Sequence, residues 1–163
     1  MINGPNSSQR SECLFQLANG DSSIGLDITG VSFRKKFYNG EEDSISFTLP
    51  DIGNQNVLIR VQGPALSAVL GSTPVLSDPV LGLYRGTSTV AYNDNWWTAS
   101  NKAAIITATS SIGLPPFPNN NANSNDAAML VNLAPGTYEI SIWGGLLGSQ
   151  TDGEMMIEVY IAP

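Results

Sequence analysis

The chain has 163 residues, of which 42% are hydrophobic and 13% charged, and it carries a net charge of −7, one cysteine and no histidine. The lack of histidine excludes Ser-His-Asp and Cys-His nucleophilic centres and imidazole metal sites, and a lone cysteine excludes an internal disulfide and a thiolate zinc cluster. The length predicts a single domain, and the acidic charge argues against nucleic acid as a partner.

An amino-terminal arm is predicted over residues 1–20, and residues 21–163 are predicted to form the domain itself. A strand is expected within the arm, where Cys13, Leu14 and Phe15 are candidate interface residues. We expect the arm to dock on its own domain or to add as a strand to the sheet of a neighbouring copy, because exposed strand edges accept such pairing.

Hydrophobic and polar residues alternate along most of the chain, which is the pattern of half-buried antiparallel strands. In a predicted strand at residues 25–33 this alternation slips between Ile28 and Val31, across Gly30, which indicates a β-bulge. The run Arg34-Lys35-Lys36 is too small for a nucleic-acid or membrane patch and is expected to be a solvated strand end. Further strands are predicted at residues 44–49, 56–62, 80–85, 88–93, 127–133, 137–143 and 154–161.

Each predicted strand is expected to turn one face toward the core and the other toward water. In the strand at residues 56–62, Val57, Ile59 and Val61 face inward and Arg60 lies on the opposite face. This alternation leaves the outward positions free for polar side chains.

One segment has a different pattern. Residues 98–113 are alanine-rich and are predicted to form a short helix that begins at the capping residues Ser100 and Asn101 and ends at Gly113. A loop rich in proline and asparagine follows at residues 114–126. About nine strands and one short helix predict an all-β fold, an antiparallel β-sandwich that is jelly-roll-like. No apolar run reaches a membrane-spanning length, so membrane insertion is not expected.

Residues 93–97 gather oxygen ligands and aromatic side chains in consecutive positions. Calcium takes about six to eight oxygen ligands, and no other cofactor is expected for this chain. The candidate metal ligands are Asn93, Asp94, Asn95 and Asp126. The alternative is an Asx-turn, in which Asp94 and Asn95 bond to their own backbone.

The three tryptophans have different expected roles. Trp96 and Trp97 are adjacent, so in an extended segment they point to opposite sides. We expect Trp96 in the core, with its indole N–H bonded to a loop carbonyl. Trp97 and Trp143 are then the exposed candidates for a protein interface or for stacking on a sugar ring.

A series of short motifs carries a resemblance to a known family. The series is Val57-Leu58-Ile59-Arg60, Gly63-Pro64-Ala65-Leu66, Asp78-Pro79-Val80-Leu81, Leu83-Tyr84, Asn93-Asp94-Asn95-Trp96, Ile105, Gly113, Asp126-Ala127-Ala128, Pro135-Gly136-Thr137-Tyr138 and Ile157-Glu158-Val159-Tyr160. It resembles an uncharacterised β-sandwich module usually found at the ends of large secreted proteins of environmental bacteria. The first 56 residues match this pattern poorly, and residues 114–126 form a longer, asparagine-rich segment. Within the series, Pro135 and Gly136 form a predicted turn, and Tyr138 faces the core.

A looser likeness connects the chain with pre-peptidase carboxy-terminal domains, which are also secreted sandwiches. It rests on residues 83–95, "LYRGTSTVAYNDN", and on residues 133–145, "LAPGTYEISIWGG". Some relatives in that wider group bind calcium or collagen-like and glycan ligands. The resemblance therefore implies an extracellular or cell-surface location and a binding or structural role without chemistry.

The sequence favours a protein that is not an enzyme. Most acidic residues lie in predicted turns, and no pair is placed to flank a cleft as glycoside hydrolysis requires. We expect a non-catalytic structural protein that forms a homo-oligomer or polymer, as the subunit of an extracellular filament, surface layer or particle. The alternative is a calcium-dependent adhesion module that binds a glycan or a surface protein.

Overall fold

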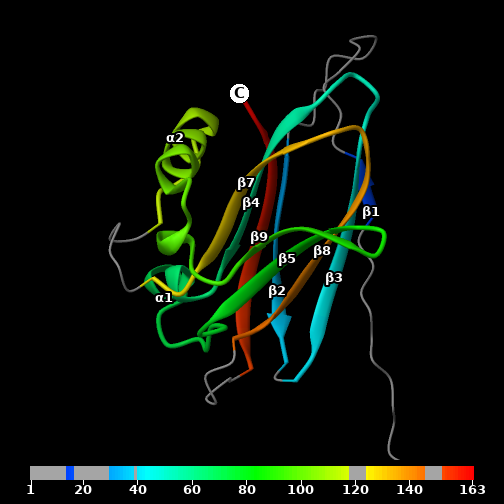
Figure 1. Cartoon of the computed structure of the whole chain (residues 1–163). Coiled ribbons are helices and arrows are strands. Elements are labelled where there is room, and N and C mark those ends of the chain that lie inside the picture. Colours follow the sequence, from blue (N-terminus) through cyan, green and yellow to red (C-terminus); the bar gives the residue numbers. More distant parts are fainter. Residues whose placement is uncertain (1–13, 17–29, 39, 118–123, 146–151) are drawn as a thin grey trace, which may run out of the picture.

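The computed structural model describes residues 14–16, 30–38, 40–117, 124–145 and 152–163, which form two facing β-sheets with a helical layer on one side (Figure 1). The five-stranded sheet has the order β1-β3-β8-β5-β6, with bounds Leu14–Gln16, Glu42–Leu49, Gly136–Gly144, Pro79–Arg85 and Ser88–Asn93. The four-stranded sheet has the order β2-β9-β4-β7, with bounds Gly30–Phe37, Gly153–Ala162, Gln55–Gln62 and Ala127–Leu133.

The strand pairs are nested along the chain. β2 pairs with β9, β3 with β8, β4 with β7 and β5 with β6, all antiparallel. The pairs β4–β9 and β5–β8 then join this nested ribbon into two sheets. Such folding of a long antiparallel ribbon is the jelly-roll arrangement, and it confirms the predicted all-β sandwich. Among the described strands, β1 alone pairs in parallel, along the free edge of β3.

The prediction for the first long strand is partly wrong. β2 spans Gly30–Phe37 and so continues past the predicted end at residue 33, and the basic run Arg34-Lys35-Lys36 occupies its last positions before Phe37, with Arg34 and Lys36 exposed as expected. Lys35 forms an ion pair with Asp43 on β3. Residues 17–29 lie outside the described part of the chain, and so does the alternation slip expected from Ile28.

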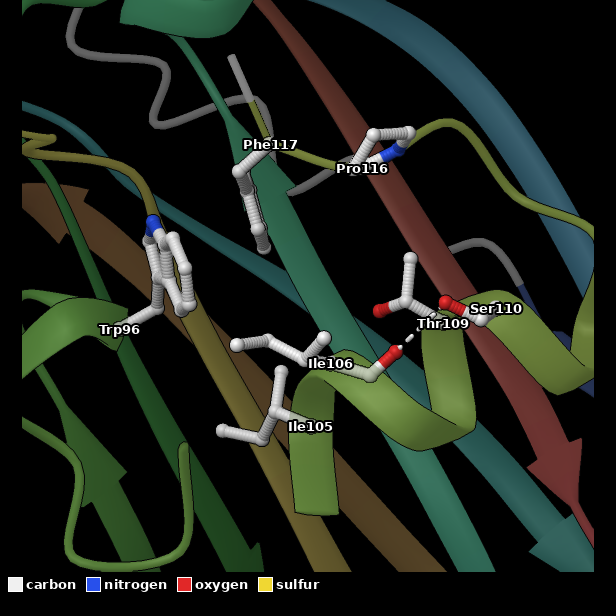
Figure 2. A pocket seen from close by; sticks show the side chains of 7 residues that line it. All are labelled: Trp96, Ile105, Ile106, Thr109, Ser110, Pro116 and Phe117. Atoms are coloured by element: carbon white, nitrogen blue, oxygen red, sulfur yellow. Dashed lines mark hydrogen bonds between the residues drawn. The ribbon is translucent and has the colours of Figure 1, made fainter. Parts of the chain in front are cut away.

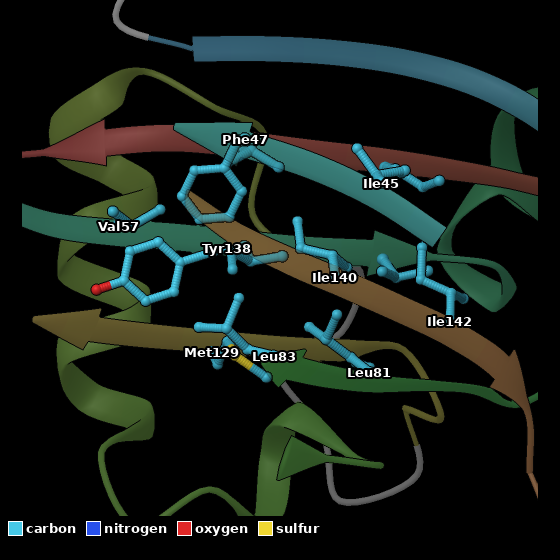
Figure 3. Close-up of a cluster of buried hydrophobic side chains, with 14 of the residues drawn as sticks. Ile45, Phe47, Val57, Leu81, Leu83, Met129, Tyr138, Ile140 and Ile142 are labelled. Atoms are coloured by element: carbon cyan, nitrogen blue, oxygen red, sulfur yellow. The ribbon is translucent and has the colours of Figure 1, made fainter. Parts of the chain in front are cut away.

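The inward faces of the two sheets form the main core, shown in Figure 3. Val57, Ile59 and Val61 on β4 all point into it, as the alternation predicts, and are fully buried. Phe47 on β3 and Tyr138 on β8 stack with ring centroids 5.6 Å apart. Stacked aromatic pairs add to the free energy gained from burial, so this pair helps to hold β3 and β8 in register.

A helical layer covers the outer face of the four-stranded sheet (Figure 1). It consists of η1 (Pro64–Leu66), α1 (Ser67–Leu70), η2 (Trp96–Thr98) and α2 (Lys102–Ile112). The second buried cluster beneath it is formed by Leu58, Ala65, Trp96, Ile105, Ala108, Phe117, Ala128 and Ala162. Leu58 and Arg60 on β4 are therefore fully buried, and the expected wet face of this strand is wrong.

The predicted helix corresponds to α2, which begins at Lys102, directly after the predicted capping residue Asn101. It ends before Gly113, whose φ of 81° is the left-handed conformation that glycine adopts most readily. Asn101 occupies the N-cap position but makes no side-chain cap, because its amide donates to the carbonyl of Leu130 on β7, at 2.9 Å. This bond ties the start of α2 to the sheet below. None of the described helices is long and apolar enough to cross a membrane.

Candidate functional site

The segment after β6 is held in place by Asn93, a buried residue at the strand's end. Its Oδ1 accepts a hydrogen bond from the backbone N–H of Ala128 on β7, at 3.0 Å. Its Nδ2 donates to the carbonyl of Asn95, at 3.3 Å. Because β6 and β7 belong to different sheets, Asn93 joins the two sheets at this edge.

Asp126 has a similar connecting role on the other side of this segment. It is 1% exposed, and its Oδ1 accepts hydrogen bonds from the backbone N–H groups of Gly63 and Ala65, at 2.8 and 3.1 Å. Its Oδ2 accepts from the Ser124 hydroxyl at 2.8 Å, and its carbonyl accepts from the backbone N–H of Trp96 at 2.9 Å. Burial nonetheless raises the pKa of the Asp126 carboxyl above its ordinary value.

Asp94 faces a different acidic residue, Asp78, which precedes β5. Burial raises the pKa of the Asp78 carboxyl, and repulsion from Asp94 raises it further. The pKa of the neighbouring Tyr92 phenol is also raised, first by desolvation and then by Asp94, Asp78 and Tyr84. The Oδ1 atom of Asp94 is buried and has no hydrogen-bond partner among the described residues. These groups create a negative potential at the end of β6.

The oxygens of the predicted metal ligands are largely engaged in hydrogen bonds within the protein. The side-chain oxygens of Asn93 and Asp126 accept hydrogen bonds from backbone amides, and Asn95 contributes its carbonyl to the turn by accepting from the Thr98 hydroxyl at 2.9 Å. Within the described ranges, no group of three or more acidic or cysteine side chains is arranged to hold a metal ion. A loop carboxylate that accepts backbone N–H groups resembles a metal ligand in sequence, so calcium binding by these residues stays a prediction.

The adjacent tryptophans lie in the helical layer. Trp96 is fully buried and stacks on Phe117, with ring centroids 4.8 Å apart. Its indole N–H has no hydrogen-bond partner among the described residues, so the expected bond to a loop carbonyl is not found in this part of the chain. Trp97 is half-buried and meets Trp96 edge-on, and the ammonium of Lys102 lies 4.2 Å from the Trp97 ring centroid. One face of Trp97 is therefore occupied by a cation.

Trp143, the other tryptophan predicted as exposed, belongs to an aromatic group on the outer face of the five-stranded sheet. We call this group the aromatic platform, and its members are Tyr84 on β5, Tyr92 on β6 and Trp143 on β8. The Tyr92 and Trp143 rings have centroids 5.9 Å apart and a tilt of 43°. Tyr92 is 56% exposed, while Tyr84 and Trp143 are half-buried.

Gly82 makes the approach of these rings possible. It pairs with Tyr92 on one side and with Ser141 on the other, so it lies between the strands that carry the platform. A Cβ at this position would lie 2.8 Å from the Tyr84 ring and 3.1 Å from the Trp143 ring. Only glycine leaves both rings room to close over the strand.

Sequence reasoning missed Tyr84 and Tyr92 as site residues. The alternation of inward and outward residues did indicate that these tyrosines face outward, because Tyr84 follows the inward residue Leu83 and Tyr92 follows the inward residue Ala91. What the alternation did not reveal is that β5 lies between β6 and β8, which brings the two tyrosines and Trp143 onto neighbouring strands.

The remaining predicted residues have structural positions. Gly136 has a φ of 137°, and the Tyr138 hydroxyl donates to the carbonyl of Ala134, at 2.8 Å. The Arg85 guanidinium donates to the carbonyl of Pro135 at 2.9 Å and lies 5.5 Å from the Tyr138 ring centroid. In the predicted arm, the backbone of residues 14–16 forms β1, whereas Cys13 lies outside the described residues.

Comparison with known proteins shows the fold. No family model matches the chain, and no curated protein matches it in sequence. The chain is similar to the pre-peptidase C-terminal domain of a collagenase from Bacillus anthracis, with a TM-score of 0.50, 14% identity, and coverage of 97% of this chain and 99% of that one. It is also similar to PliG of Aeromonas hydrophila, a periplasmic inhibitor of g-type lysozyme, with a TM-score of 0.50, 9% identity, and coverage of 92% and 96%. The likeness to pre-peptidase C-terminal domains expected from the sequence is confirmed at the level of the fold.

Proposed function

We propose that the protein is a non-catalytic extracellular binding module that holds a glycan on the aromatic platform. The observation that carries this proposal is the convergence of Tyr84, Tyr92 and Trp143 over Gly82 on the sheet face opposite the helical layer. The three rings lie side by side on neighbouring strands, with Tyr92 56% exposed, and adjoining exposed aromatic side chains mark ligand-binding surfaces.

The chemistry of the platform suits an uncharged sugar. The C–H groups on one face of a pyranose ring carry small positive charges, and they stack favourably on the negative face of an aromatic ring. Asp94 is half-buried beside Tyr92 and can accept hydrogen bonds from sugar hydroxyls, and the buried Asp78 lies near both. The same carboxylates and the net charge of −7 repel anionic sugars, so neutral glycans are the expected class.

The location outside the cytoplasm has separate support. The chain is poor in charged residues, and one structure with a similar fold is a periplasmic protein. The other similar structure is the pre-peptidase C-terminal domain of a collagenase. Both agree with a module that works by binding.

The test begins with a glycan array of neutral and charged oligosaccharides, followed by calorimetric titration of the best ligand. Replacing Tyr92→Ala or Trp143→Ala should weaken binding at least about tenfold, because stacking on one ring contributes on the order of 1–2 kcal/mol. Tyr38→Ala is the matched control, since Tyr38 is an exposed tyrosine on the β2–β3 connection, 48% exposed. Binding that survives both platform substitutions would refute the proposal.

The same titration decides whether calcium takes part. It is repeated with calcium and with a chelator, and with Asp94→Asn. Calcium-dependent binding requires affinity to fall when the metal is removed and requires Asp94→Asn to abolish that difference. Equal affinities with calcium and with chelator leave a calcium-independent glycan module.

A second candidate function is the subunit of an extracellular filament, surface layer or particle. The observation that favours it is β1, a three-residue parallel strand added to the edge of β3. The same edge could accept the arm of a neighbouring copy, because a short edge strand is held by only a few backbone hydrogen bonds.

Light scattering after size-exclusion chromatography tests this second function. The full-length protein should form a homo-oligomer or polymer whose size rises with concentration, and deletion of residues 1–20 should convert it to a monomer. A monomer at every concentration, with and without these residues, would exclude assembly through the arm.

A further inference from the structure

A cavity of about 170 Å³ lies within the helical layer, on the side of the molecule away from the aromatic platform. Figure 2 shows its walls, which come from η2, α2 and the segment at residues 114–117. Trp96 and Ile105 are fully buried in the wall, and Phe117 stacks on Trp96. The lining is mostly apolar and the cavity is partly open, with Ile106 at 38% exposure.

Two polar groups in this wall have no hydrogen-bond partner among the described residues, the indole N–H of Trp96 and the hydroxyl of Thr109. Thr109 is 3% exposed, and its Oγ1 makes no hydrogen bond with any described residue. Figure 2 shows this hydroxyl turned toward the space between Ile106 and Phe117. A buried hydroxyl without a partner is rare in native proteins, because its desolvation is then uncompensated.

The other hydroxyl groups of α2 show that Thr109 differs from them. The hydroxyls of Thr107, Ser110 and Ser111 each donate to the carbonyl one turn earlier in the helix, at 3.0, 3.0 and 2.9 Å. This is the usual bond of serine and threonine within helices. Thr109 is the most buried of the four and alone lacks this bond, so its hydroxyl is available to a molecule inside the cavity.

The buried side chain of Arg60 supports Phe117, which forms part of the cavity wall. Arg60 is fully buried, and its Nη1 donates a hydrogen bond to the carbonyl of Pro115 at 3.0 Å. Its guanidinium lies 4.4 Å from the Phe117 ring centroid, and its Nε lies 3.1 Å from Glu158 Oε2. These contacts fix the position of Phe117 from below, so the cavity has a preorganised wall.

We propose that this cavity binds a small cyclic ligand with one hydroxyl group, of the size and polarity of phenol, and that Thr109 hydrogen-bonds the ligand hydroxyl. The size supports one ring, because an apolar cavity of about 150 Å³ accepts benzene. The walls supply apolar contact, and Thr109 supplies one directional contact, which is the usual division of roles in a ligand pocket. This site is independent of the glycan platform.

Phenol and toluene are the probes, since they have similar shapes and differ in the hydroxyl. The full-length protein is titrated with each by calorimetry, and backbone amide shifts by NMR locate the site. We expect phenol to bind about fivefold more tightly than toluene, the effect of one net hydrogen bond. The amide shifts should centre on Ile105, Thr109 and Phe117.

Two substitutions test the role of Thr109. Thr109→Val keeps the side-chain shape and removes the hydroxyl, so phenol affinity should fall to that of toluene while toluene affinity is unchanged or higher. Thr109→Ser keeps the hydroxyl and should keep the preference for phenol. Neither substitution should alter glycan binding at the platform.

Three results would overturn the proposal. The first is that neither probe binds at roughly millimolar concentration. The second is equal affinity of the wild-type protein for phenol and toluene. The third is a phenol preference that survives Thr109→Val, since the hydroxyl partner would then lie elsewhere.

Discussion

Asp126 shows how much of this structure depends on a single side chain. It accepts three side-chain hydrogen bonds, two of them from the backbone of the turn at residues 63–65, and its carbonyl holds the start of η2. Gly63 cannot be replaced easily in this turn, because a Cβ there would lie 1.9 Å from the carbonyl oxygen of Leu76. Asp126 therefore fixes the point where β4, η1 and η2 meet.

We predict that Asp126→Ala lowers the free energy of unfolding by about 3 kcal/mol, because two buried N–H groups lose their acceptor at about 1–3 kcal/mol each. Asp126→Asn is the control. Its Oδ1 can still accept from Gly63 and Ala65, and the Ser124 hydroxyl can accept from the new amide, so a loss of about 1 kcal/mol or less is expected. Urea denaturation of the two variants measures the difference. Equal losses would show that the hydrogen bonds accepted by Oδ1 do not account for the effect.

The strands were largely predictable from the sequence, and the layer that covers them was not. Alternation located β3 to β9 because each has an inward face of apolar residues, such as Val57, Ile59 and Val61 on β4. Alternation also placed Arg60 on the outer face, but it could not show that α2 and Phe117 bury that face. A buried arginine looks like a solvated one in sequence, since its Glu158 partner lies far along the chain.

The candidate sites were predictable to a smaller extent for a related reason. Trp143 was predicted from its outward position in the alternation. The platform also needs Tyr84 and Tyr92, and the proximity of the three rings depends on the strand order β8-β5-β6. The cavity could not be predicted, because the sequence does not show which hydroxyl of α2 is buried without a hydrogen-bond partner. In the predicted metal set, Asp126 and Asn93 accept backbone N–H groups, which spacing along the chain does not reveal. Strand order and local hydrogen bonding thus decide both sites, and neither can be inferred from spacing.

The whole molecule carries a net charge of −7, and desolvation raises the pKa values of two of its buried carboxyl groups, Asp78 and Asp126. A raised pKa in the folded state means that the folded protein binds protons at a pH where the unfolded chain has released them. Folding is therefore favoured by protonation, and this contribution is lost as the pH rises through the folded-state pKa. Lower pH also reduces the repulsion between the excess negative charges.

We predict that the melting temperature is higher at pH 5 than at pH 7, because protonation of the carboxyl groups with raised pKa and the smaller net charge both favour the folded state. Asp78→Asn removes one of the two groups responsible, so the variant should be more stable than the wild type at pH 7 and closer to it at pH 5. Asp51→Asn makes the same charge change at an exposed turn and should leave the pH dependence unchanged. Calorimetric scans at both pH values, repeated at high salt to screen the net charge, separate the two causes. A melting temperature that falls toward pH 5, or equal pH dependence in both variants, would show that buried Asp78 does not control acid stability.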